Sequence, residues 1–408
     1  MWLTGATVID GTGADPVPNH SIRVEDGRIA SLGGAPPAGA DVLDCTGLVI
    51  TPGLIDAHVH LGMSSDIGQS LSKQISVAEL AADMFENCRQ TLHSGFTTVR
   101  DTGGIDDGLA RVVADVKVPG PRIIHCGPLL AQTGGHGYLG AAWEPSEDWE
   151  SHHIVGLRAV SFLSDGPDSV RKNAREAFRR GASFLKMCVT GGVVSHHDKL
   201  TDTQFTSDEI AAAVAEASAR GTYVTVHAHN NTGLRTAIHA GAKCVEHGSE
   251  IDDEMAALMA QRGVAHVPTL AVVHALLDGP AAAGLPAHIG ARVGRVLEGQ
   301  TAAIHASRAA GVLIGSGSDY IGPNQQRRGY EITLRAKVED PMAALLSATR
   351  DNARILRIDD EVGTISPGKL ADLTAFAGNP LDDPDIFADH NRVPVVVQRG
   401  RVVKDQRS

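Results

Sequence analysis

The sequence predicts an α/β protein, a (β/α)8 TIM barrel with a small β-sandwich domain formed by the N- and C-terminal segments. Three observations lead to this prediction: strand-like and helix-like segments alternate through the middle of the chain, short β-type segments occupy both ends, and glycine follows several helix-like segments. Strands that alternate with helices form parallel sheets, and eight such units close into a barrel. We place the small β domain at residues 1–50 and 359–408 and the barrel at residues 51–358.

The two ends of the chain contain short β-type segments. At the N-terminal end these are ATVID (6–10), HSIRVEDGRIASLG (20–33) and ADVLDCTGLVI (40–50), and at the C-terminal end GTISPGKLADLTAFAG (363–378) and VPVVVQRGRVVKD (393–405). Gly, Pro and Asp separate them, as is typical of turns between strands. We therefore expect both ends to contribute strands to one domain.

The middle of the chain holds eight candidate strands, which are Leu54–His58, Phe96–Asp101, Arg122–Cys126, Ser183–Val189, Thr222–His227, Lys243–His247, Val264–Leu270 and Val312–Ser316. Helices fit between them. The clearest begins at a capping box of Thr206 and Glu209 and ends at Gly221, and similar helices are expected over 253–263 and 301–311. The connection over 127–165 is unusually long, and such loops of a barrel shape the substrate pocket.

Composition excludes several classes of function. The chain has 408 residues, of which 42% are hydrophobic and 21% charged, and no apolar run approaches the roughly 18 residues of a membrane span. The net charge of −12 disfavours nucleic acid and anionic membranes as partners. The N-terminal residues lack the pattern of a signal peptide, so we expect a cytoplasmic protein.

Histidine is the most informative residue type. The chain has 19 histidines but only five cysteines, and the cysteines form no CxxC pair, which disfavours both a disulfide framework and a zinc–thiolate cluster. Imidazole is the commonest metal ligand and the usual acid or base near neutral pH. The composition therefore points to metal binding or acid–base chemistry.

Candidate metal ligands fall at the carboxyl ends of the predicted strands, where a barrel builds its active site. They are His58 and His60 in DAHVH, Lys186, His227 in VTVHAH, His247 in CVEHGS, and Asp319 in GSGSD. The HxH pair alone is a weak signal, although residues two apart on a strand share a face. By itself His247 could equally be a core histidine and Asp319 an ordinary helix N-cap, but ligand types on several strands at one end strengthen the metal interpretation.

Lys186 lies within the apolar segment FLKMCV, where a buried, unpaired ammonium is costly unless it loses its charge. A neutral lysine serves two chemistries. It can form a Schiff base with a carbonyl substrate, or it can react with carbon dioxide to give a carbamate that bridges two metals. The surrounding histidines favour the carbamate.

Six motifs, PGLIDAHVHLG, TTVRDTGG, FLKMCVTGGV, VHAHN, VEHGSEIDDE and GSGSD, resemble the signatures of the amidohydrolase superfamily across essentially the whole chain. Their order is most similar to the branch of dipeptidases, metal-dependent carboxypeptidases and ochratoxin-hydrolysing amidases. The resemblance implies a homo-oligomer, possibly an octamer, with two divalent metal ions, usually Zn²⁺. It assigns His58, His60 and Asp319 to the first ion, His227 and His247 to the second, and a carbamylated Lys186 to the bridge between them.

Two metals about 3.5–4 Å apart would supply hydroxide from a bridging water at neutral pH. Asp319 is then placed to act as general base and acid, with Lys186 completing the catalytic set. His229 could donate to the developing oxyanion or merely support its neighbours. The expected substrate contacts are His229, the long-loop residues His136 and Tyr138, and His274. Arg100 in TTVRD is interpreted as structural.

The leading hypothesis is a hydrolase that cleaves an amide bond next to a C-terminal amino acid, as in a dipeptide, an N-acyl amino acid or an ochratoxin-like amide. An alternative is the opening of a cyclic amide, as in imidazolonepropionase-like relatives. A metal-free Schiff-base lyase using Lys186 is a third possibility. A non-catalytic scaffold is disfavoured because all six candidate ligands are present.

Overall fold

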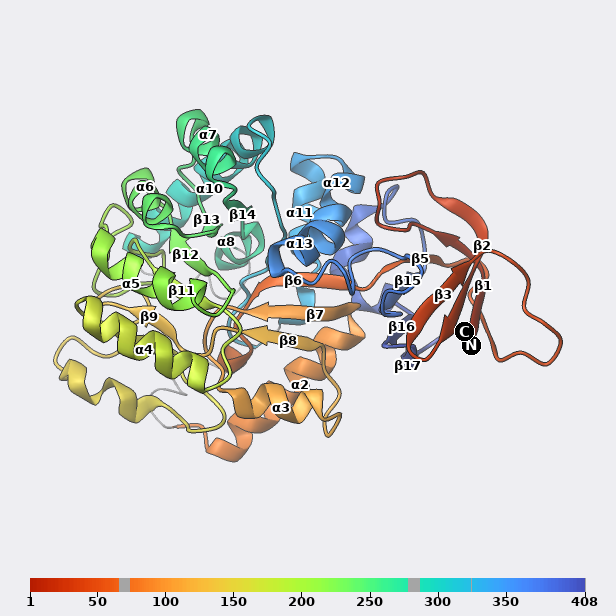
Figure 1. Ribbon diagram of the computed structural model, residues 1–408, viewed down its shortest axis with the longest axis horizontal. Coiled ribbons are helices and arrows are strands. Elements are labelled where there is room, and N and C mark those ends of the chain that lie inside the picture. The colour runs from red at the N-terminus through yellow and green to blue at the C-terminus, as the bar shows by residue number, and fades with distance from the viewer. Residues whose placement is uncertain (66–73, 278–286, 324, 408) are drawn as a thin grey trace.

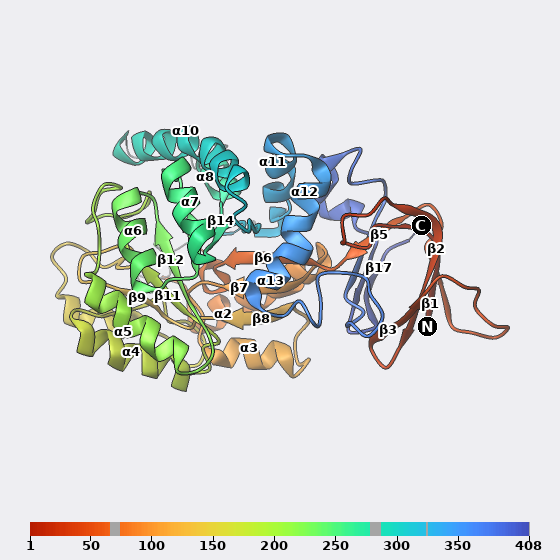
Figure 2. The same ribbon diagram turned by 45° about the horizontal axis from the view of Figure 1, so that its top comes forward.

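The computed structural model describes residues 1–65, 74–277, 287–323 and 325–407. A barrel with helices outside it lies beside a smaller β domain, and both ends of the chain lie in that β domain (Figure 1). Helices α11 (Tyr330–Val338), α12 (Pro341–Leu346) and α13 (Asn352–Leu356) lie between the two parts in both views (Figures 1 and 2). Among the described residues, no helix has the length and apolar character needed to cross a membrane.

Eight strands from the two ends of the chain form the small domain. They are β1 (Trp2–Val8), β2 (Val17–Glu25), β3 (Arg28–Leu32), β4 (Val42–Asp44), β5 (Val49–Pro52), β15 (Leu373–Phe376), β16 (Val395–Gln398) and β17 (Arg401–Asp405). The order is β17-β16-β15-β5-β1-β2-β3, with β4 branching from β1. The expected mixing of both ends is confirmed, and the strands join in one branched sheet. The boundaries at residues 50 and 358 stay predictions.

The barrel strands run parallel and belong to two sheets. One contains β6 (Leu54–Val59), β7 (Phe96–Asp101) and β8 (Arg122–His125), and the other has the order β10-β9-β11-β12-β13-β14. The second sheet consists of β9 (Leu129–Ala131), β10 (Ser161–Leu163), β11 (Leu185–Cys188), β12 (Val224–Ala228), β13 (Cys244–His247) and β14 (Ala265–Val267). Each predicted segment before residue 312 therefore contains a strand, whereas β9 and β10 lie unpredicted inside the long connection.

The segment 312–316 does not form the regular eighth strand that the sequence predicts. It still lies between the two sheets, because His266 forms an isolated parallel bridge with Ile314 and the Ala57 amide donates to the Ser316 carbonyl at 2.9 Å. Glycine explains the irregularity: a Cβ at Gly317 would lie 2.5 Å from the Cβ of His58. The backbone therefore passes unusually close to the first barrel strand just before Asp319.

The helices outside the barrel follow the strands. They are α2 (Val77–His93), α3 (Asp107–Ala114), α4 (Pro167–Arg179), α5 (Ser207–Ser218), α6 (Asn231–Ala240), α7 (Asp253–Arg262), α8 (Leu270–Leu277) and α10 (Ala287–Ala309). The capping box of Thr206 and Glu209 begins α5 as predicted. The helix expected over 301–311 is instead the last part of the 23-residue α10.

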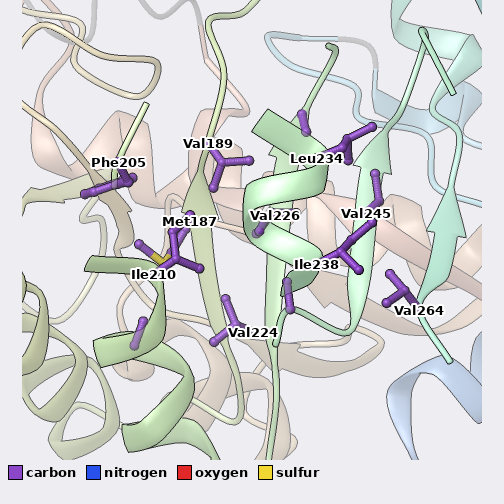
Figure 3. Close-up of a cluster of buried hydrophobic side chains, with 14 of the residues drawn as sticks. Met187, Val189, Phe205, Ile210, Val224, Val226, Leu234, Ile238, Val245 and Val264 are labelled. Atoms are coloured by element: carbon purple, nitrogen blue, oxygen red, sulfur yellow. The ribbon is translucent and has the colours of Figure 1, made fainter. Parts of the chain in front are cut away.

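Alternation along the strands separates the outer core from the barrel interior. Met187 on β11 and Val189 just after it, and Val224 and Val226 on β12, lie in one hydrophobic cluster with residues of α5 and α6 (Figure 3). Because successive side chains of a strand point to opposite faces, Lys186 points into the barrel. The same alternation turns Thr225 and His227 inward.

Candidate metal centre and substrate cavity

The first group of the site comes from β6 and the segment after residue 316. The Nε2 atoms of His58 and His60 lie 3.3 Å apart, and each lies within 3.3 Å of Asp319 Oδ1. His58 is 1% exposed and Asp319 lies within reach of both rings, so three donor atoms converge away from bulk water. The predicted same-face placement of His58 and His60 is therefore seen.

His247, at the end of β13, joins this group. One ligand atom each from His58, His247 and Asp319 lie within 4.8 Å of one another, close enough to take part in metal binding. His247 and Asp319 also have left-handed backbones, with φ of 71° and 55°. Such conformations are unfavourable for non-glycine residues and persist where the surrounding structure imposes them, often at functional sites.

A hydrogen bond at Nδ1 fixes the orientation of each of these imidazoles. His58 Nδ1 lies 2.8 Å from Glu246 Oε2, His60 Nδ1 lies 2.7 Å from the Gly103 carbonyl, and His247 Nδ1 lies 2.6 Å from Thr269 Oγ1. Partners of this kind set the tautomer and the ring orientation of metal-binding histidines.

Lys186, His227 and His229 lie on the neighbouring strands. Lys186 is 3% exposed and pairs in register with Thr225, and within the described residues its ammonium has no hydrogen bond and no ion pair. The His227 ring lies 4.5 Å from that of His247, and the His229 ring stacks on His247 at 5.1 Å. The lysine therefore occupies the interior among imidazoles, as the carbamate hypothesis requires.

The electrostatics favour the neutral imidazole at His227, His229 and His247. Burial lowers the pKa of His227 and His247 well below the usual value, and lowers the pKa of His229 to about 4. Burial also opposes the charged form of His60, but the hydrogen bond and charge of Asp319 outweigh it and raise the pKa of His60. A neutral imidazole keeps the lone pair that a metal ligand needs.

Asp319 has the opposite electrostatic environment. Burial alone would raise the pKa of its carboxyl group, but His58 and His60 hold the pKa well below the usual range. The donor set is thus one carboxylate and the imidazoles of His58, His60, His227 and His247, a combination that Zn²⁺ accepts. The residues present therefore fit a divalent metal ion.

Above these residues lies a cavity of about 120 Å³. His60, His136, His227, His229, His247 and Asp319 line its polar end. Most of the remaining wall is aliphatic, from Met63, Leu129, Leu139, Val160, Val193, Val194, Val272, Val273, Leu276, Val296 and Ile321. Within the described part of the chain, no arginine or lysine lines the cavity.

The predicted substrate contacts are only partly brought to this cavity. His136 lines it and stacks on His227, with ring centroids 4.0 Å apart. Tyr138 instead lies against Trp149 and His197, and His274 lies on α8 near Tyr330. Neither belongs to the described lining, so substrate contacts from Tyr138 and His274 stay predictions.

The sequence interpretation of Arg100 as structural agrees with its surroundings. Its side chain is fully buried, donates to the Ala57 carbonyl, and pairs with Glu246 at 2.6 Å. Glu246 in turn holds His58, so it links a buried arginine to a candidate ligand. Sequence reasoning missed Glu246, although its place beside His247 on a buried strand was an available signal.

Two further residues of α10 were missed because helix residues far along the chain carry no local motif. Arg292 donates to the carbonyls of Gly192, Val193, Ser195 and Asp198, in the segment that follows β11. Gln300 lines the cavity. Only the three-dimensional packing brings these side chains to the site.

Comparisons with known proteins show which family the chain resembles. Residues 49–403 match the amidohydrolase family. The chain is 28% identical to ochratoxinase from Aspergillus niger over 413 aligned residues, covering 97% of this chain and 85% of that protein. The crystal structure of a prolidase complexed with N-methylphosphonate-L-proline is similar, with a TM-score of 0.91, 34% identity and 99% coverage of both chains. A Xaa-Pro dipeptidase structure has a TM-score of 0.85, 29% identity and 99% coverage of both chains.

Proposed function

The chain belongs to the amidohydrolase family and is a hydrolase of amide or peptide C–N bonds, and we propose that it uses two divalent metal ions to cleave an amide bond next to a C-terminal amino acid. Dipeptides, N-acyl amino acids and ochratoxin-like amides are the proposed substrates. The observation that carries the proposal is that His58, His247 and Asp319 lie within 4.8 Å of one another, and that His247 and Asp319 also line a largely apolar cavity.

We assign His58, His60 and Asp319 to one metal ion, His227 and His247 to the other, and a carbamate on Lys186 to both. The burial of Lys186 near imidazoles supports this assignment, because a carbamate would replace an ammonium that makes no hydrogen bond within the described residues by an anion with two ligand atoms. Zn²⁺ is the proposed metal, since imidazole and carboxylate ligands suit it. Bound divalent ions polarise a scissile carbonyl and make water acidic enough to lose a proton near pH 7.

Asp319 is the proposed proton carrier. Its carboxylate is held ionised by His58 and His60, so it can accept a proton from the attacking water. It can then return that proton to the leaving amine, because the same carboxylate borders the cavity. One residue would thus serve as general base and then as general acid.

His229 is the proposed donor to the oxygen on which negative charge develops. Its Nδ1 lies 3.0 Å from Ser249 Oγ. If the Ser249 hydroxyl donates to Nδ1, the neutral ring carries its proton on Nε2 and can donate it into the cavity. The proposed role therefore depends on Ser249 setting the tautomer of His229.

The proposal is tested by screening dipeptides and N-acyl amino acids for released amino acid, with metal content measured on protein purified without chelator. We expect hydrolysis and about two metal ions per chain. Full activity in metal-free protein would end the proposal. Cleavage of cyclic amides alone would favour cyclic amide hydrolysis, and trapping of substrate on Lys186 by borohydride would favour a Schiff-base lyase.

A further inference from the structure

Gln300 is a buried polar residue in the wall of this largely aliphatic cavity. It lies on α10, is 1% exposed, and lines the cavity together with Val296, which precedes it by one helical turn. Its carboxamide oxygen Oε1 is buried and has no hydrogen-bond partner within the described residues. Leaving a buried acceptor unpaired costs about 1–3 kcal/mol. A ligand that donates a hydrogen bond to Oε1 would remove this cost.

The orientation of the Gln300 amide is fixed by its other end. Nε2 donates to the Thr269 carbonyl at 3.1 Å. Exchanging the two ends of the amide would place Oε1 against that carbonyl, and two acceptors would then face each other. The end of the amide that has no partner among the described residues is therefore an acceptor.

The backbone around Gln300 is also fixed close to the metal centre. A Cβ at Gly299 would lie 2.1 Å from the Ser249 carbonyl oxygen, so only glycine allows α10 to approach this turn. The Ser249 hydroxyl is hydrogen-bonded to His229, and the Thr269 hydroxyl is hydrogen-bonded to His247. Gln300 is thus connected to the candidate site through Thr269 and through the turn at Ser249.

We propose that Gln300 is a specificity-determining residue whose Oε1 accepts a hydrogen bond from a neutral N–H or O–H group on the substrate. The inference rests on the proposed amide hydrolysis and deepens it: the substrate group in the aliphatic part of the cavity is apolar but carries one donor, as a phenol, an indole or a hydroxyalkyl side chain does. No cationic side chain of the described lining competes for this acceptor.

Matched substrate pairs test the proposal. Dipeptides and N-acyl amino acids are compared that differ only by Tyr against Phe, Trp against naphthylalanine, or Thr against Val, with the varied residue on either side of the scissile bond. In the wild-type enzyme we expect kcat/KM to favour the donor-bearing member of at least one pair by roughly 10- to 100-fold. In Gln300→Met, which keeps length but removes the acceptor, that ratio should fall to within about threefold of one.

The control variant is Val296→Ala, which enlarges the same cavity without changing its polar groups and should keep the preference. Wild-type ratios near one for every pair would overturn the proposal, whether or not the variants fold. Equal losses on both members in Gln300→Met would also overturn it, because Gln300 would then act only by positioning Thr269 and His247.

Failure of the proposed function is a separate outcome. If the wild-type protein hydrolyses no member of any pair, the same pairs are compared as ligands by calorimetry. A preference for donor-bearing members that disappears in Gln300→Met would then support the role of Gln300 while the hydrolytic function fails. Equal affinities within every pair would overturn the inference.

Discussion

Lys186 shows how one residue depends on its neighbours. Its side chain alternates with the outward-facing Met187 and so points into the barrel interior, where it lies near neutral imidazoles. A lysine that only filled space here would be replaceable by a smaller residue at a modest cost in packing. A lysine that supplies a metal-bridging anion would not be.

Lys186→Ala should therefore lower kcat/KM by more than about 100-fold, beyond the 10- to 100-fold typical of residues that only orient a metal ligand. The metal content should also fall. Short carboxylic acids such as acetate should restore part of the activity by replacing the carbamate, as measured in steady-state assays over an acid concentration series. The exposed Lys172→Ala is the control. Rescue by amines instead would point to Schiff-base chemistry.

Glu246 connects metal binding to stability. It accepts from Arg100 on one side and contacts His58 on the other, and all three side chains are at most 1% exposed. Glu246→Gln removes the charge that compensates Arg100, so we expect a loss of about 3–5 kcal/mol in the free energy of unfolding, measured in urea. Metal affinity should fall roughly 10- to 100-fold, because His58 loses its orienting partner.

The matched control for Glu246 is Glu25→Gln, which breaks the exposed pair of Arg23 with Glu25 and should cost about 1 kcal/mol or less. If both variants lost the same small amount of stability, the buried pair would have no special role. Unchanged metal affinity in Glu246→Gln would contradict the orientation of His58 by Glu246, but not the role of Glu246 in stability.

Glu331 on α11 predicts a pH dependence of stability. Burial raises the pKa of its carboxyl group to about 8, although Arg335 opposes this, and its Oε2 accepts from the Ala271 amide of α8 at 2.8 Å. Between pH 4.5 and 8 the unfolded state has lost this proton while the folded state keeps it. This group's contribution to stability is therefore complete below pH 4.5 and is lost as the pH rises through 8.

Glu331→Gln should flatten this pH dependence. The variant keeps an acceptor for Ala271 but cannot ionise, so at pH 8 it should gain about 1–3 kcal/mol relative to the wild type when both are compared with pH 5. Urea unfolding at several pH values measures the difference. Glu298→Gln, at an exposed position of α10, should leave the slope unchanged. Parallel curves for Glu331→Gln and the wild type would contradict the prediction.

At the scale of elements, the segment 191–198 and α10 act together on His136. Arg292 donates hydrogen bonds to several carbonyls of this segment. Ser195, in the same segment, has its Oγ 2.5 Å from His136 Nδ1. The His136 ring stacks on His227, so the position of a cavity residue depends on a helix that is distant from it in sequence.

Gly192→Ala tests this arrangement, because a Cβ at residue 192 would lie 2.2 Å from His136 Nδ1. Displacing the ring should raise KM by about tenfold, the scale of one lost hydrogen bond in binding, with a smaller change in kcat. Steady-state kinetics on the best substrate of the screen measures both. Gly290→Ala on α10, where a Cβ would meet nothing within 4 Å, is the control. A change in kcat alone would mean that His136 does not hold substrate.

Elements also explain what the sequence could and could not predict. The candidate ligands were predictable because parallel strands bring their carboxyl ends together, so His58, His227 and His247 could be placed without a structure. The irregular closing segment before Asp319 was not, because its path is set by close contact with His58. Tyr320, which follows Asp319, could have pointed at the cavity from sequence alone, yet it packs into a hydrophobic cluster with Leu270 and Ile304.

At the scale of the whole molecule, the site joins parts of the chain that are far apart in sequence. The proposed ligands come from β6 and the residue after it, β11, β12, β13 and Asp319. The segment before Asp319 is joined to β14 by an isolated bridge at Ile314 and to other neighbours by backbone and side-chain hydrogen bonds, such as those of Ser318 to Asp56. A cation bound by these residues would therefore cross-link this irregular segment to β6 and β13.

Metal removal should for this reason lower the stability of the whole protein as well as its activity. A ligand that binds only the folded state at 100 times its Kd adds about 2.7 kcal/mol, so chelation should lower the unfolding midpoint by several degrees, and added Zn²⁺ should restore it. Differential scanning calorimetry measures the shift. Asp319→Asn removes the carboxylate shared by His58 and His60, so its midpoint should no longer respond to chelator. If the wild-type midpoint were also insensitive to chelator while activity disappeared, the metal would serve chemistry without closing the barrel, and the left-handed backbones of His247 and Asp319 would need another source of support.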